Sequence, residues 1–159
     1  MTKELSEIID VFQSVEVKTR LELLLDFSKQ LPELDERHAA ERDAGIHRVP
    51  ECMSPVFLWV EPDSHIINSS NQTVHLILDV AEEAPTIKGF LSIILQAFDH
   101  HPAHEIVALP LDLVNRLGLS SVIRMNRAHG IAAIITRIRN GAAALSADSK
   151  TITAGGENK

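Results

Sequence analysis

Residues 48–59 read Arg-Val-Pro-Glu-Cys-Met-Ser-Pro-Val-Phe-Leu-Trp and hold the only cysteine of the chain, Cys52. Pro50 and Pro55 lie on either side of this cysteine. Because a proline disfavours helical geometry in the residue before it, the segment between the two prolines is predicted to be a loop. The apolar run 56–60 that follows is rich in β-branched and aromatic residues, which indicates a strand buried on both faces. The sequence therefore predicts a thiol on a loop at the entrance to a buried strand.

A lone thiol in this position has two interpretations. Free cysteine is among the most buried residue types and often serves only as a small apolar side chain. The polar neighbours Arg48, Glu51 and Ser54 are instead typical of a partly exposed, reactive thiol, because nearby cationic groups favour the thiolate. The residues alone leave both interpretations open.

Composition limits the class of protein. A chain of 159 residues with 45% hydrophobic and 23% charged residues is expected to form one globular domain. Its formal net charge of −7 argues against nucleic acid and against an anionic membrane as partners. One cysteine excludes an intrachain disulfide, and we find no signal peptide or membrane-length apolar run. These features predict a cytoplasmic protein.

The N-terminal part of the chain is predicted to be helical up to a charged stretch. Apolar residues at helical spacing predict one amphipathic helix over residues 3–15 and a second that begins near Ser14, as its N-cap, and ends before Pro32. Residues 33–49 are polar and alternate in charge, which predicts a long loop or a weak helix leading into Cys52.

Three short strands are predicted in the middle of the chain, at 56–60, 65–67 and 73–80. Tight turns rich in Pro, Asp, Asn and Ser separate them. In the third, apolar residues alternate with more polar ones, as in a strand with one buried face. Short connections of this kind predict an antiparallel meander.

The pattern then changes to helical periodicity. A helix is predicted from Pro85 to Phe98, followed by two brief helical pieces at 102–108 and 111–117 and a long helix from Ile123 to Leu145. The two main helices are expected to share a core with the sheet through Phe90, Leu91, Ile94, Ile131, Ile134 and Ile138. Residues 146–159 lack apolar periodicity, so the domain is predicted to cover 1–145 and the rest to be a disordered tail.

The sequence suggests two other kinds of site. The stretch Asp99-His100-His101-Pro102-Ala103-His104-Glu105 looks like a metal site, but adjacent histidines on a helix cannot face one ion and no second ligand pair lies at zinc-motif spacing. We therefore expect no metal. A cysteine hydrolase would pair Cys52 with a histidine and an orienting acid, and no hydrolase signature surrounds Cys52.

Four short landmarks follow one another along the chain: Leu31-Pro32-Glu33-Leu34, Cys52-Met53-Ser54-Pro55-Val56-Phe57, Thr86-Ile87-Lys88-Gly89 and Arg127-Ala128-His129-Gly130. Taken together and in this order, they resemble the SufE family of sulfur acceptors. The resemblance covers residues 6 to 145. It departs from the family at Glu51, where glycine is common, and at Phe57, where tryptophan is common. A carboxylate beside the thiol should raise its pKa.

The resemblance implies a function, a fold and a set of site residues. Cys52 would accept sulfur as a persulfide from a cysteine desulfurase and pass it toward an iron–sulfur scaffold complex. Arg127 matches the family's arginine, which implies partner docking or anion stabilisation near the loop, and Glu83 resembles a partner-contact position. From the residues alone, Arg127 is also consistent with a helix-face arginine that packs its stem and pairs with a carboxylate. Glu83 is also consistent with a favourable charge near a helix N-terminus.

The implied fold is α+β, with a three-stranded antiparallel sheet packed on one side by several helices, similar to the iron–sulfur scaffold fold. No cofactor of its own is implied, since the desulfurase carries pyridoxal phosphate, and no activity is expected without that partner. A homodimer stays open. The alternatives are a cysteine-dependent hydrolase and a plain α+β binding module.

Overall fold

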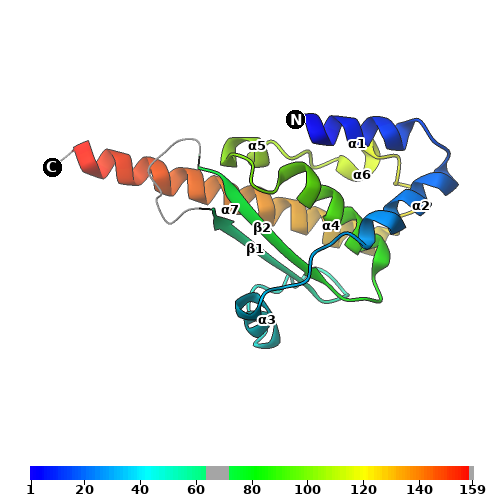
Figure 1. The fold of residues 1–159 in the computed structure, drawn as a ribbon, viewed down its shortest axis with the longest axis horizontal. Helices are drawn as coiled ribbons and strands as arrows, with labels where there is room; N and C mark the ends of the chain where they lie inside the picture. Colours follow the sequence, from blue (N-terminus) through cyan, green and yellow to red (C-terminus); the bar gives the residue numbers. More distant parts are fainter. Residues whose placement is uncertain (64–71, 158–159) are drawn as a thin grey trace.

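The computed structural model describes residues 1–63 and 72–157 and has an α+β architecture (Figure 1). Its elements in chain order are α1 (Lys3–Gln13), α2 (Val17–Ser28), α3 (Glu36–Asp43), β1 (Val56–Pro62), β2 (Val74–Val80), α4 (Pro85–Phe98), α5 (Ala103–Val107), α6 (Leu113–Arg116) and α7 (Met125–Glu157). The α+β class implied by the resemblance is confirmed.

The sheet is built on an antiparallel pair of strands. β1 and β2 pair from Val56 opposite Val80 at one end to Pro62 opposite Val74 at the other. Burial alternates along β2, as its sequence predicts, whereas the first four residues of β1 are all buried. The strand predicted at 65–67 lies outside the described residues, so the described sheet is two-stranded rather than three-stranded. A single antiparallel bridge between Arg48 and Phe57 extends it beside β1.

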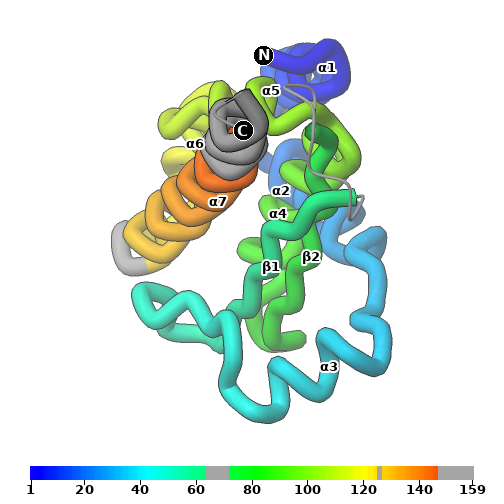
Figure 2. Tube along the Cα trace, turned by 90° about the vertical axis from the view of Figure 1, so that its left-hand side faces the viewer, coloured from blue at the N-terminus to red at the C-terminus, as the bar shows by residue number. Residues whose placement is uncertain are grey.

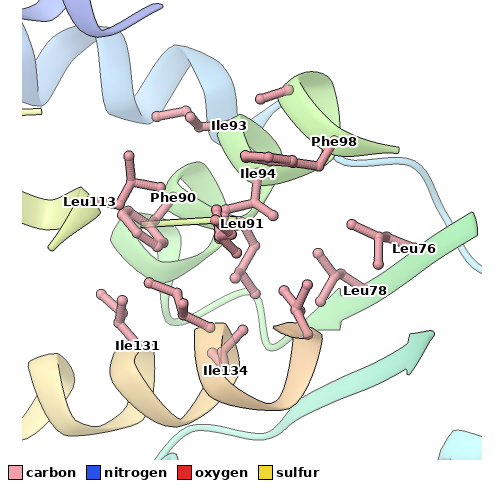
Figure 3. Packing of buried hydrophobic residues seen from close by; sticks show 14 of the residues in the cluster. Leu76, Leu78, Phe90, Leu91, Ile93, Ile94, Phe98, Leu113, Ile131 and Ile134 are labelled. Atoms are coloured by element: carbon pink, nitrogen blue, oxygen red, sulfur yellow. The ribbon is translucent and has the colours of Figure 1, made fainter. Parts of the chain in front are cut away.

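The core lies between the sheet and the two main helices. Pro85 occupies the first turn of α4, where its missing N–H costs no hydrogen bond. Side chains from α4 and α7 point toward one another across this layer, with those of β2 beside them (Figure 3). All six residues expected to form the shared core are buried: Phe90, Leu91, Ile94, Ile131, Ile134 and Ile138.

Helices cover the sheet on both faces, not on one face as predicted. α1 and α2 contact α4, and α4 contacts β2. α3 lies on the other side of the strands from α1, in two views at right angles (Figures 1 and 2). Because α3 lies on this second side, the first four residues of β1 are buried on both faces.

Although its sequence is polar, α3 makes a specific set of contacts with the sheet. The side chain of Asp35 accepts a hydrogen bond from the backbone N–H of His38 at 2.9 Å and so caps the helix. His38 is only 3% exposed and packs edge-on against Trp59, with ring centroids 5.0 Å apart. Arg37 contacts Glu61 at 2.7 Å. One buried ring and a few ion pairs thus hold a helix that has no apolar stripe.

Two element ends differ from the prediction. Ser14 is the C-cap of α1, and α2 begins after Glu16, which makes no side-chain cap. The backbone of α7 continues to Glu157, past the predicted boundary at residue 145. The segment contains no proline that would end a helix. The division of the chain at residue 145 stays a prediction.

Among the described residues, no helix combines the length and the apolar character needed to cross a bilayer.

Candidate functional site

Backbone hydrogen bonds hold Cys52 at the tip of a short loop between residues 49 and 56. The N–H of Val49 donates to the carbonyl of Val56 at 2.9 Å, and the N–H of Cys52 donates to the carbonyl of Val49 at 3.2 Å. Pro55 anchors the outgoing end, because its carbonyl accepts from Ala81 at 3.0 Å. The predicted position at a loop–strand junction is confirmed, and the loop is fixed at both ends.

The thiol itself is buried rather than partly exposed. Cys52 is 9% exposed, although the next residue, Met53, is 79% exposed. The sulfur lies against α7 at Gly130, where an added Cβ would stand 2.9 Å from Sγ. The thiol therefore occupies space that is free only because Gly130 has no side chain. In the sequence, Gly130 directly precedes Ile131, one of the residues expected in the core, but the burial of Cys52 depends on a contact 78 positions away in the chain.

The surroundings of Cys52 favour the neutral thiol. Burial raises its pKa above the ordinary value, and the negative charge of Glu51 raises it further. The positive charges of Arg137 and Arg48 act in the opposite direction without reversing the shift of this pKa. The expected effect of Glu51 on the pKa is confirmed in direction, although burial is the larger cause.

An ion pair fastens the loop to α7 at a second point. Nη2 of Arg137 donates to the two carboxylate oxygens of Glu51 at 3.1 and 3.3 Å. A hydrogen bond from the backbone N–H of Glu51 itself and the nearby guanidinium lower the pKa of this carboxyl group. Arg137 follows Gly130 by seven residues, or two helical turns, which places both on one side of α7. That spacing is the signal by which the sequence could have identified Arg137.

A cavity of about 300 Å³ opens beside the thiol. It is lined by Cys52, Met53, Ser54, Pro55, Val56, Glu83, Ile87, Arg127 and Gly130. The structure thus brings all three predicted site residues to one cavity, although they come from the loop, the segment before α4 and the first turn of α7. Glu83 is exposed and Arg127 is half-buried. The walls offer one carboxylate and one guanidinium beside a thiol.

The fold and the site define a small α+β protein with one loop-borne thiol enclosed between the loop and two helices. The chain belongs to the SufE family, since the family model of this Fe-S metabolism associated domain matches residues 6–142.

Relatives agree with this family, and a solved structure agrees with the fold. Two uncharacterized SufE-like proteins of Mycobacterium tuberculosis strains are each 38% identical over 135 residues, which cover 85% of this chain and 88% of theirs. An uncharacterized SufE-like protein of Rhizobium etli is 26% identical, over 85% of this chain and 86% of its own. The solution structure of a hypothetical protein from Thermus thermophilus has a TM-score of 0.72 at 21% identity, with 95% and 98% of the two chains covered. It supports the fold.

Proposed function

We propose that the protein accepts sulfur on Cys52 from a pyridoxal-phosphate-dependent cysteine desulfurase and passes it on for iron–sulfur cluster assembly. The observation that carries the proposal is the enclosure of the only thiol of the chain beside a cavity in a SufE-family fold. A persulfide must be protected from water and from other thiols between its formation and its delivery. A cavity that adjoins a buried thiol meets this need, because it has room for an added sulfur atom.

The transfer itself is a thiol exchange at sulfur. The thiolate of Cys52 attacks the outer sulfur of a cysteine persulfide on the desulfurase, and a new sulfur–sulfur bond forms at Cys52. The bond between the two sulfurs of the partner breaks, and the partner's cysteine leaves as a thiolate that takes up a proton. The outer sulfur moves with no net oxidation or reduction, so one cysteine on the acceptor suffices.

The resting state described above is not suited to attack. Cys52 is buried, its pKa is raised, and the loop is fastened to α7 at Gly130 and Arg137. A thiolate forms readily only where positive charge compensates it. Docking of the desulfurase would therefore have to draw the loop outward and surround the sulfur with the partner's own groups. This requirement confines the reaction to the complex.

The rim of the cavity offers a docking surface. Met53 is a large exposed apolar side chain next to the thiol, and Glu83 and Arg127 carry opposite charges within the same cavity wall. Charges at a rim guide association more than they add to its affinity. Arg127 and Glu83 are therefore proposed as partner-binding residues. The pyridoxal phosphate belongs to the desulfurase, the scaffold complex is proposed as the downstream acceptor, and the cytoplasm is the proposed compartment.

A hydrolase is less well supported by the same site. It would need a histidine within hydrogen-bond reach of the thiol to accept its proton. None of the described residues that line the cavity is a histidine. The raised pKa of Cys52 also disfavours a nucleophile that must act without a partner.

Sulfide release tests the proposal. A desulfurase that turns over L-cysteine should release sulfide faster with the wild-type protein and a reductant, and no faster with Cys52→Ser than without any acceptor. If the protein were a plain binding module, the Cys52→Ser variant would stimulate sulfide release as well as the wild-type protein does. A hydrolase would cleave an activated ester on its own.

A further inference from the structure

A second group of polar side chains lies at the other end of the hairpin from Cys52. Cys52 precedes the end at which Val56 pairs with Val80, whereas Pro62 pairs with Val74 at the far end, roughly 20 Å away for strands of this length. At the far end, one ligand atom from each of Asp63, His75 and His100 lies within 4.8 Å of the others. The sulfur-acceptor function proposed above does not use this group.

Backbone contacts fix the three positions relative to one another. The N–H of Asp63 donates to the carbonyl of Thr73 at 3.1 Å, which continues the pairing of β1 with β2. The N–H of His100 donates to the carbonyl of Val74 at 2.8 Å, next to His75. His100 adopts a left-handed conformation with φ of 63°, which turns the chain at the end of α4 toward the strands. The set is thus assembled from three separate parts of the chain.

The ring of His75 is held in a defined orientation. Its Nδ1 is 2.9 Å from Oδ1 of Asp99, and the same oxygen accepts a hydrogen bond from the N–H of Leu76 at 2.8 Å. An ionised carboxylate only accepts, so Nδ1 carries the proton and Nε2 of the neutral ring keeps its lone pair. Histidines that bind metals are oriented by a carboxylate in this way.

The other two side chains are already in contact. Nδ1 of His100 is 2.7 Å from Oδ1 of Asp63, and the ring of His100 stacks on that of His75 at 4.7 Å and 10°. One ion cannot lie in the planes of two parallel rings, so binding requires one ring to turn. The side chain of His100 is 60% exposed and has room to do so. The ligand atoms would close to about 3.4 Å, the spacing of a tetrahedral site with bonds of about 2.0–2.1 Å.

We propose that Asp63, His75 and His100 bind a divalent transition-metal ion, for which Zn²⁺ is the best match, and that Asp99 orients His75. A set of imidazole and carboxylate ligands suits Zn²⁺ and other divalent first-row transition metals, whereas Mg²⁺ and Ca²⁺ prefer oxygen ligands alone. Three protein ligands leave one position for water. The bound ion would tie the end of the hairpin to the end of α4.

The sequence argued against a metal site because adjacent histidines on a helix cannot face one ion and no second ligand pair lies at zinc-motif spacing. The structure removes both arguments. Adjacent histidines need not share the ion, because His101 instead contacts Glu105 at 2.6 Å. The missing ligands come from the end of β1 and from β2, which no local spacing in the sequence reveals.

Titration calorimetry with Zn²⁺ alone tests the proposal, on a Cys52→Ser background that removes the thiol as a competing ligand. We expect one saturable site. His75→Ala and His100→Ala should each weaken binding at least 10-fold, and Asp99→Asn should weaken it by about 10- to 100-fold, as expected for a group that orients a ligand. His104→Ala, which removes an exposed histidine of α5, should bind like its parent. His101→Ala should do the same.

Thermal unfolding separates lost binding from lost folding. Without metal, His100→Ala should melt close to its parent, and only the parent should gain stability when Zn²⁺ is added, because a ligand that binds the folded state stabilises it. The proposal is overturned if the parent shows no saturable site. It is also overturned if His101→Ala or His104→Ala weakens binding as much as His75→Ala does.

Discussion

Gly130 of α7 lies directly against the sulfur of Cys52, so that a methyl group at position 130 would stand 2.9 Å from Sγ. Contacts this short do not persist, and either the sulfur or the loop must move. The resting position of the thiol therefore depends on a residue with no side chain on a helix far away in sequence.

Gly130→Ala should displace Cys52 from its buried position. We expect the thiol to react faster with a neutral alkylating reagent and the free energy of unfolding to fall by about 1–3 kcal/mol through overpacking. Gly141→Ala is the matched control. Gly141 also lies on α7, and an added Cβ there would stand 2.9 Å from Cβ of Val60 on β1, far from the thiol in the chain. It should lose similar stability with no gain in thiol reactivity. Equal reactivity in the two variants would contradict this account of the site.

Glu51→Gln and Arg137→Gln should shift the pKa of Cys52 in opposite directions. Glu51 raises this pKa and Arg137 lowers it, so loss of the carboxylate should move the pH profile of alkylation to lower pH. Loss of the guanidinium should move the profile to higher pH, because the carboxylate then acts without its partner. The alkylation rate measured across the alkaline range checks this. Shifts of the same sign would show that loop opening, not charge, governs the thiol.

Ile134→Ala should remove about 2–4 kcal/mol from the free energy of unfolding in urea, since Ile134 is fully buried between α7 and the rest of the core. Leu111→Ala provides the comparison, because Leu111 is 59% exposed and should change stability by less than about half a kilocalorie. Similar small losses in both variants would mean that the inward stripe of α7 contributes little.

Arg127→Glu and Glu83→Lys should weaken association with the desulfurase most at low ionic strength. Charges at the rim of an interface act over about 10 Å at 0.1 M salt, and added salt screens them. Lys18→Glu on α2 changes an exposed charge that does not line the cavity and should have little effect. Binding measured over a salt series would count against this docking surface if all three variants behaved alike.

Features set by local sequence were predictable, and features set by distant contacts were not. The period-two pattern of β2 and the apolar stripe after Pro85 were enough to identify β2 and α4. For α3 the sequence predicts either a long loop or a weak helix, because this helix is stabilised by the Asp35 cap and by the contact of His38 with Trp59, and not by an apolar stripe.

The site shows the same division. The two prolines were enough to place Cys52 on a loop, and the family landmarks indicated Arg127 and Glu83, which line the same cavity. The burial of the thiol could not be predicted, since it depends on the space left at Gly130. The pairing of Arg137 with Glu51 could not be predicted either, because the two residues are 86 positions apart in the chain.

The most direct test of the central claim is the intact mass of the protein after incubation with a cysteine desulfurase and L-cysteine. Wild-type protein should gain the mass of one sulfur atom, which a reductant removes and which peptide mapping places on Cys52. Cys52→Ser, which leaves the chain without cysteine, should gain nothing. A wild-type protein that never gains this mass, or a Cys52→Ser protein that does, would contradict the assignment of Cys52 as the sulfur acceptor.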